Sequence, residues 1–121
     1  MKLLTGKIGM NIKRGDIYLA SLDPVIGNEI SKTRPVIVVS NDINNEYSST
    51  VTILPVTSAN LDKIYPFEVI LLKGEGNLSK NSKVKANQIR TIDKTRLIKF
   101  LGEIQDMTEI DNSIKIHLSL N

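Results

Sequence analysis

The residues best suited to chemistry lie in a polar loop, 27–35, that ends in an arginine and a proline. Arg34 precedes that proline, and the residue before a proline is held in an extended backbone conformation. A run of apolar, β-branched residues follows at once, so we expect Arg34 at the mouth of a buried strand. Its guanidinium carries five donors in a fork that matches phosphate oxygens. The alternative is a surface arginine paired with Glu29 or Asp42.

Two hydroxyls and one carboxylate could complete such a site. Thr57 and Ser58 end an apolar segment, where a hydroxyl could donate to a phosphate oxygen or bond its own backbone. Glu29 is the loop carboxylate nearest to Arg34 in the sequence. It could act as a base, orient the arginine, or simply be solvated.

Positive charge is concentrated in one stretch, although the whole chain has a formal net charge of only +3. Residues 80–99 contain seven cations and one anion. We call this stretch the basic band. It predicts a nucleic-acid or acidic-peptide partner, with a solvated protein face as the alternative. Gln88 and Arg90 lie within it and could touch bases or phosphates, or merely cover the sheet.

The composition excludes several other classes of site. There is no cysteine, so disulfides and thiolate metal sites are excluded. His117 is the single histidine, which excludes imidazole clusters and argues against a Ser-His-Asp triad. No segment has the roughly 18 apolar residues that a membrane span requires. We therefore expect no thiolate or imidazole-cluster metal site, no cofactor, no membrane association and a cytoplasmic location.

Strand patterns dominate the chain, and a length of 121 residues favours one domain. Residues 12–121 are expected to form it, preceded by a loose extension at 1–11. Pro55 cannot donate to a strand ladder, so it predicts a bulge or an edge. Asp106 and Glu109 have the spacing of a capping box before a helix. Strands are expected at 16–22, 36–40, 50–57, 67–72, 82–86 and 99–104, and a single helical turn at 93–97.

The C-terminal helix should bury one face. Its apolar residues recur at helical spacing, and they are Met107, Ile110, Ile114 and Leu118. Helical signals are otherwise confined to the end of the chain, and Asn41 and Asp42 are interpreted as a turn. Many short strands with one terminal amphipathic helix predict a small, bent β-barrel with the helix packed against it.

Six segments, taken in order, resemble the MazF/PemK family of toxin endoribonucleases, and the likeness spans about residues 12–120. The segments are 13–18, 23–29, 34–42, 55–58, 65–69 and 87–93. The resemblance implies a mainly β, SH3-like barrel with a C-terminal helix, usually a homodimer. It also implies metal-independent cleavage of single-stranded RNA, often messenger RNA, and an antitoxin with an acidic, apolar tail that occludes the site.

The resemblance also carries residue roles. It places the catalytic arginine on Arg34, the catalytic hydroxyl on Thr57 and the loop glutamate on Glu29. Asn28 and Asn87 depart from common family patterns, which bears on the choice of RNA sequence. The expected RNA contacts are Asn28, Ser58, Lys85, Gln88 and Arg90.

The implied reaction is attack of the RNA 2′-hydroxyl on the adjacent phosphorus, which leaves a 2′,3′-cyclic phosphate and a 5′-hydroxyl. Two other readings stay open at this point. One is a non-catalytic SH3-like module that binds peptide or nucleic acid. The other is a gyrase-inhibiting toxin of the same fold, which would lack the site at Arg34 and Thr57.

Overall fold

The computed structural model describes residues 11–121, and the predicted extension at 1–11 lies outside this range except for Asn11. Seven strands, all paired antiparallel, form one sheet in the order β4-β5-β3-β2-β1-β7, with β6 also paired to β3. The strands are β1 (Asp16–Ser21), β2 (Thr33–Val38), β3 (Thr50–Thr57), β4 (Glu68–Leu71), β5 (Ser82–Lys85), β6 (Arg90–Asp93) and β7 (Leu97–Glu103).

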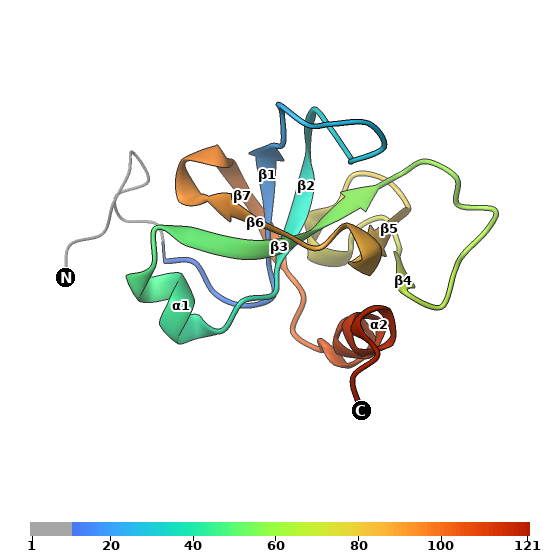
Figure 1. Ribbon diagram of the computed structural model, residues 1–121. Coiled ribbons are helices and arrows are strands. Elements are labelled where there is room, and N and C mark those ends of the chain that lie inside the picture. Colours follow the sequence, from blue (N-terminus) through green and yellow to red (C-terminus); the bar gives the residue numbers. More distant parts are fainter. Residues whose placement is uncertain (1–10) are drawn as a thin grey trace.

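Five helical segments join or follow these strands. They are the α-helices α1 (Asp42–Tyr47) and α2 (Thr108–Leu118) and the 3-10 turns η1 (Glu75–Asn77), η2 (Ala86–Gln88) and η3 (Lys94–Arg96). β3 crosses the middle of the molecule, with α1 near one of its ends and α2 below the other (Figure 1). The mainly β fold with a C-terminal helix is therefore confirmed. Within residues 11–121, no helix is both long and apolar enough to cross a lipid bilayer.

The sheet separates two apolar cores because alternate strand residues face opposite sides. On β1, Ile17 joins the core that also contains Leu54 and Ile110 of α2. Tyr18 and Ala20 join the other core. This alternation was predicted from the sequence of β1. Both faces of the central strands are thus buried, which fixes the register at which their ends meet.

α2 begins one residue later than the capping-box prediction requires. Met107 is its N-cap and makes no side-chain cap bond, whereas Asp106 accepts from the backbone N–H of Thr108 at 3.1 Å. Asp106 therefore forms a local turn ahead of the helix rather than the cap. The predicted apolar face is buried at Met107 and Ile110, but Leu118 is 47 % exposed. The buried face thus ends before the last turn.

Two elements were missed by the sequence analysis. α1 forms where a turn was expected, because the side chain of Asn41 caps it by accepting from the backbone N–H of Asn44 at 2.8 Å. β6 is only four residues long and pairs with the first half of β3. Such a short strand has too few residues for its alternation to stand out.

Pro55 lies inside the central strand β3 and is neither at an edge nor at a recorded bulge. β3 pairs with β6 through residues 50–53 and with β5 through residues 56–57. Pro55 thus lies where β3 changes partners, so its missing amide hydrogen breaks no ladder on that side. This interruption lets the sheet turn just before Thr57.

Candidate functional site

The pairing of β2 with β3 brings the two predicted catalytic positions together. Val36 pairs with Pro55, Ile37 with Leu54 and Val38 with Ile53. Continuing this antiparallel register by two residues places Arg34 opposite Thr57, and residues that face each other in this way share one side of the sheet. The two positions are therefore neighbours at the ends of adjacent strands.

Arg34 is half-buried, and its side chain turns back over its own loop. Its Nε donates to the backbone carbonyl of Ser31 at 2.8 Å. None of the three ion pairs among the described residues includes Arg34. Glu29 and Asp42 instead accept from backbone N–H groups, so the surface-ion-pair alternative for Arg34 is wrong. The Nε bond fixes the direction of the guanidinium and leaves its two terminal nitrogens for a ligand.

Thr57 is 8 % exposed, so only a small part of it reaches the surface. Its Oγ1 accepts from the backbone N–H of Ala59 at 3.2 Å. This bond occupies a lone pair and leaves the hydroxyl proton free to donate. Ser58, the next residue, is exposed and lines the hollow beside Arg34. Thr57 itself does not line this hollow, so the end of β3 offers one open hydroxyl in the hollow, Ser58, and one sheltered hydroxyl beside it.

The hollow beside Arg34, here called the Arg34 pocket, has a volume of about 350 Å³. Its walls contain two cations, Arg34 and Lys80, and no carboxylate. Its full lining is Leu19, Thr33, Arg34, Pro35, Val56, Ser58, Asn77, Leu78, Ser79, Lys80, Ser82 and Leu101. Cations beside hydroxyl donors, with no competing acid, suit a phosphate group.

Glu29 does not line the Arg34 pocket. It lines a neighbouring hollow of about 410 Å³ together with Asn28, Gln88 and Arg90. Its Oε1 accepts from the backbone N–H of Ile26 at 2.7 Å, which stabilises the loop. Four of the predicted residues thus meet at one place, although they come from segments about sixty positions apart. This second hollow is here called the loop pocket.

Gln88 and Arg90 also hold the β1–β2 loop in place. Gln88 Oε1 accepts from the backbone N–H of Ile30 at 3.3 Å, and an Arg90 terminal nitrogen donates to the carbonyl of Leu22 at 2.9 Å. Arg96 makes a similar bond to the carbonyl of Ser21 at 3.1 Å. These contacts anchor both ends of the loop that carries Glu29.

Two of the seven cations of the basic band are buried and a third is bound to a buried carboxylate, which the charge pattern alone did not reveal. Lys83 is 4 % exposed and donates to Glu68 at 3.2 Å, while Lys85 donates to the other oxygen of Glu68 at 2.8 Å. Lys94 is also buried, and this burial lowers the pKa of its ammonium group. The band is therefore in large part a structural feature. Lys85, predicted to contact RNA, is committed to a buried carboxylate.

Lys83 ties down the segment that follows Thr57. Besides Glu68, its ammonium donates to the backbone carbonyls of Asn60 at 2.9 Å and Lys63 at 3.1 Å. Glu68 in turn accepts from the backbone N–H of Tyr65 at 3.0 Å. Since Lys83 also pairs with Thr57 in the sheet, this network positions the end of β3.

We expect this network to make the fold sensitive to acid. Burial acts to raise the pKa of Glu68, but hydrogen bonds from Lys85, the Tyr65 N–H and Lys83 outweigh it and lower the pKa below its ordinary value. The resulting stabilisation is present above the carboxyl pKa of the unfolded chain and is lost as pH falls through the folded-state pKa. Glu68→Gln should lower the free energy of unfolding by about 3 kcal/mol at pH 7.

Urea unfolding between pH 3 and pH 7 measures this effect. The matched control is Asp62→Asn, an exposed carboxylate on the β3–β4 loop that precedes Glu68, which should change stability by less than about 0.5 kcal/mol. Equal stability of Glu68→Gln and the parent at pH 7 would show that the buried charges do not stabilise the fold.

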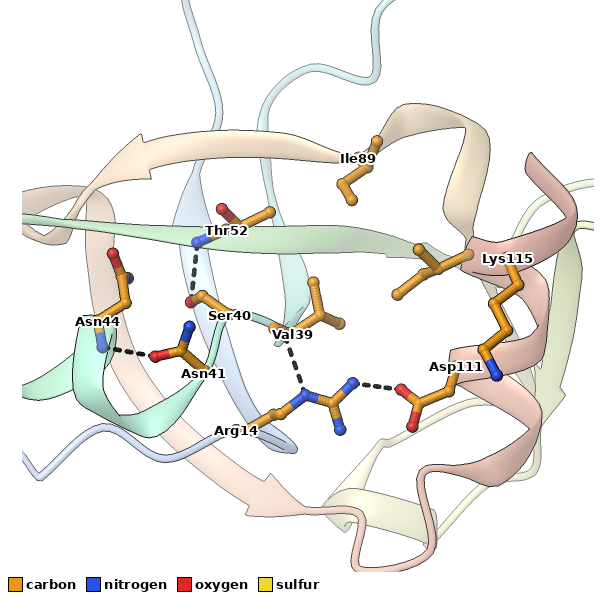
Figure 2. Close-up of a pocket in the computed structure, with 10 residues that line it drawn as sticks. Arg14, Val39, Ser40, Asn41, Asn44, Thr52, Ile89, Asp111 and Lys115 are labelled. Atoms are coloured by element: carbon orange, nitrogen blue, oxygen red, sulfur yellow. Dashed lines mark hydrogen bonds and ion pairs between the residues drawn. The ribbon is translucent and has the colours of Figure 1, made fainter. Parts of the chain in front are cut away.

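Another hollow, of about 600 Å³, lies between α1 and α2 (Figure 2). Arg14 crosses it, donating through Nε to the carbonyl of Val39 at 3.0 Å and through a terminal nitrogen to Asp111 of α2. None of the residues predicted to be functional lines it. Because its arginine is already paired with a carboxylate, this hollow is less suited to an anion than the Arg34 pocket.

The sequence analysis missed the far wall of the Arg34 pocket. Asn77 ends η1, and Ser79 and Lys80 lie between η1 and β5, all more than forty positions from Arg34. Lys80 was counted in the basic band, but no motif linked it to the loop at 27–35. Only the three-dimensional arrangement of the segments reveals this proximity.

The pocket at the two strand ends contains cations and hydroxyls but no carboxylate. These features place the chain among small β-sheet proteins that bind anions. Comparison with known proteins is more specific. Residues 13–118 match the family model described as the PemK-like, MazF-like toxin of type II toxin-antitoxin systems. The chain is 42 % identical over 113 residues to a Staphylococcus epidermidis protein named Endoribonuclease MazF, covering 91 % of this chain and 93 % of that one.

Solved structures agree with this match. A MazF crystal structure from Deinococcus radiodurans is 26 % identical, with a TM-score of 0.79 over 92 % of this chain and 99 % of that one. A MazE-MazF structure from the same organism is 27 % identical, with a TM-score of 0.68 over 91 % and 95 % of the two chains. The chain belongs to the PemK-like, MazF-like toxin family, and it is a homologue of an endoribonuclease.

Proposed function

We propose that this protein is a sequence-specific endoribonuclease toxin that cuts single-stranded RNA without a metal ion. The observation that supports this most is the Arg34 pocket, which holds two cations and several hydroxyls but no carboxylate. A phosphodiester fits this chemistry, and the family contains endoribonucleases. A gyrase-inhibiting toxin of the same fold would lack the Arg34 and Thr57 pair; here the two positions lie opposite each other on β2 and β3, which supports the nuclease proposal, although Thr57 itself does not line the pocket.

In the proposed reaction the 2′-hydroxyl oxygen forms a bond to the adjacent phosphorus, and the bond from phosphorus to the 5′-oxygen breaks. The products are a 2′,3′-cyclic phosphate and a 5′-hydroxyl, so no water enters this step. Negative charge collects on the phosphoryl oxygens in the transition state. Arg34 stabilises that charge, and the Thr57 hydroxyl donates to one of the same oxygens, as preorganised donors do in many enzymes.

Two protons must also move, one from the 2′-hydroxyl and one to the leaving 5′-oxygen. Arginine stays protonated at ordinary pH, so we assign Arg34 mainly to charge stabilisation, and the leaving 5′-oxygen takes its proton from solvent water. Glu29 is our candidate for the base that takes the first proton. It lies on the loop that ends at Arg34 but lines the neighbouring loop pocket, so this role requires the 2′-hydroxyl to lie at the junction of the two pockets.

The proposed RNA path continues from the Arg34 pocket to the loop pocket. There Asn28, Gln88 and Arg90 present amides and a guanidinium, the groups that read base edges and bind phosphates. Because Gln88 and Arg90 also hold the β1–β2 loop, RNA bound there would contact a fixed wall. This arrangement supports selection of a short sequence.

We also propose that a cognate antitoxin inhibits the protein and that it acts as a homodimer. Similar chains are found with antitoxins in the MazE-MazF structure from Deinococcus radiodurans and in a mycobacterial endoribonuclease complex. For the dimer, β7 ends the strand order and carries exposed apolar residues, Ile98 at 49 % and Phe100 at 49 %. A second copy would cover such a surface.

The proposed function is tested with purified protein in EDTA. Single-stranded RNA is added to one sample, and gyrase with supercoiled DNA to another. We expect RNA cut at one recurring short sequence and no trapped gyrase complex. Trapped gyrase without RNA cleavage would favour the second toxin type, and inactivity in both assays would favour a binding module. Cleavage that requires added metal would contradict the proposed chemistry.

A further inference from the structure

Hydrogen bonds fix the backbone of the far wall of the Arg34 pocket. Leu78, which anchors this wall, is 4 % exposed, and its carbonyl accepts from the N–H of Gly74 at 2.8 Å. Asn77 donates to the carbonyl of Leu101 on β7 at 3.0 Å. Ser82 donates to the carbonyl of Lys80 at 2.9 Å. The backbone around Lys80 is therefore held on both sides, so the point from which the lysine side chain extends is fixed.

Lys80 is the charged residue of this wall, and its ammonium group pairs with no carboxylate among the described residues. Lys80 takes part in none of the three ion pairs there, and its ammonium makes no recorded hydrogen bond. This contrasts with Lys83 and Lys85 on the following strand, which both bind Glu68. Ser79 and Lys80 are exposed, with their side chains available to a ligand.

A pocket with two uncompensated cations on facing walls favours more than one negative charge. RNA carries such charges on successive backbone phosphates. One phosphate beside Arg34 leaves Lys80, Ser79 and the Thr33 hydroxyl unused. These groups are one cation and two hydroxyl donors, the set that binds a second phosphate.

We propose that Lys80 and Ser79 form a phosphate subsite of the Arg34 pocket, which binds the backbone phosphate next to the one that is cut. This inference rests on the proposed function, because it assumes that RNA is the substrate. Lys80 binds and positions the strand, and it takes no part in bond breaking. An RNA strand would thus be held across the pocket, with the scissile phosphate at Arg34.

The first test is Lys80→Gln, which removes the charge and keeps most of the side chain. We expect KM for an RNA oligonucleotide to rise about tenfold, while kcat changes little. The slope of log kcat/KM against log salt should become shallower by about 0.7, the value for one phosphate contact on a single strand. Lys115→Gln is the matched control, because Lys115 is exposed on α2 and lines a different hollow.

The second test neutralises the RNA instead of the protein. Oligonucleotides carry one uncharged methylphosphonate at each linkage next to the mapped cleavage site in turn. For the parent protein, one neighbouring linkage should show a loss of about tenfold in kcat/KM. For Lys80→Gln that same change should cost nothing further, because coupled partners give non-additive effects.

Each outcome decides between the claims. If the parent cuts RNA and Lys80→Gln behaves as Lys115→Gln does, the subsite is wrong and the proposed function stands. If a methylphosphonate lowers kcat/KM by the same factor at every neighbouring linkage, in the parent and in Lys80→Gln alike, then Lys80 contributes only general positive charge. The subsite is again wrong in that case. A loss of antitoxin binding without any change in KM for RNA would assign Lys80 to an acidic peptide. If the parent does not cut RNA, both proposals fail.

Discussion

Arg34→Gln should lower kcat for RNA cleavage by about 10²–10³ with little change in the fold. The guanidinium is the group that we propose to stabilise charge on the phosphoryl oxygens. Its removal weakens the transition state far more than the bound substrate. Single-turnover cleavage of an oligonucleotide with excess enzyme measures the chemical step directly. Binding should weaken much less than cleavage, because Lys80 and the loop pocket keep their contacts.

Arg34→Lys is the matched variant for this prediction. It keeps the charge but loses the fork and the Nε bond to Ser31. We expect an activity between those of the parent and Arg34→Gln. The thermal midpoint of each variant shows whether the loop remains folded. Cleavage by Arg34→Gln at the parental rate would remove Arg34 from the mechanism.

Thr57→Val should lower kcat by about 10²-fold, whereas Ser58→Ala should reduce it much less. Valine has the shape of threonine without the hydroxyl, so it removes the proposed donor while filling the same space. Ser58 is exposed on the pocket wall and belongs to the binding surface. The comparison therefore separates the sheltered hydroxyl from the open one. Single-turnover rates at saturating protein provide the measurement.

The opposite ranking would change the site. If Ser58→Ala lost more activity than Thr57→Val, the donor at the end of β3 would be Ser58. The 8 % exposure of Thr57 would then mark it as a structural residue that bonds Ala59. Either ranking can be interpreted only if both variants melt near the parental temperature.

The fold was predictable where one periodicity governs a long segment. β1, β3 and α2 have a clear alternation or helical spacing, so their type and approximate bounds were correct. α1 and β6 were missed, although β4 and β5, each as short as β6, were predicted. α1 has six residues, and β6 is stabilised by its pairing with β3. Local sequence contains little of that information.

The sequence marked single positions of the proposed site rather than its arrangement. Arg34 and Thr57 were proposed because a proline and a strand end mark them, and the register of β2 and β3 places them opposite each other. The division into two hollows was not foreseen, and Glu29 lies in the one that Arg34 does not line. The charge pattern misled for a physical reason. A sequence shows the number of cations, but it does not show that Glu68 binds two of them inside the protein.

The central claim is that the RNA supplies its own nucleophile at Arg34 and Thr57. Mass spectrometry of the cleavage products in EDTA tests it most directly, together with a substrate that has one 2′-deoxy residue at the cleavage site. The account predicts 2′,3′-cyclic phosphate and 5′-hydroxyl ends, and a deoxy substrate that binds but stays intact. Products with 3′-hydroxyl ends, or cleavage of the deoxy substrate, would contradict it, because water would then be the nucleophile.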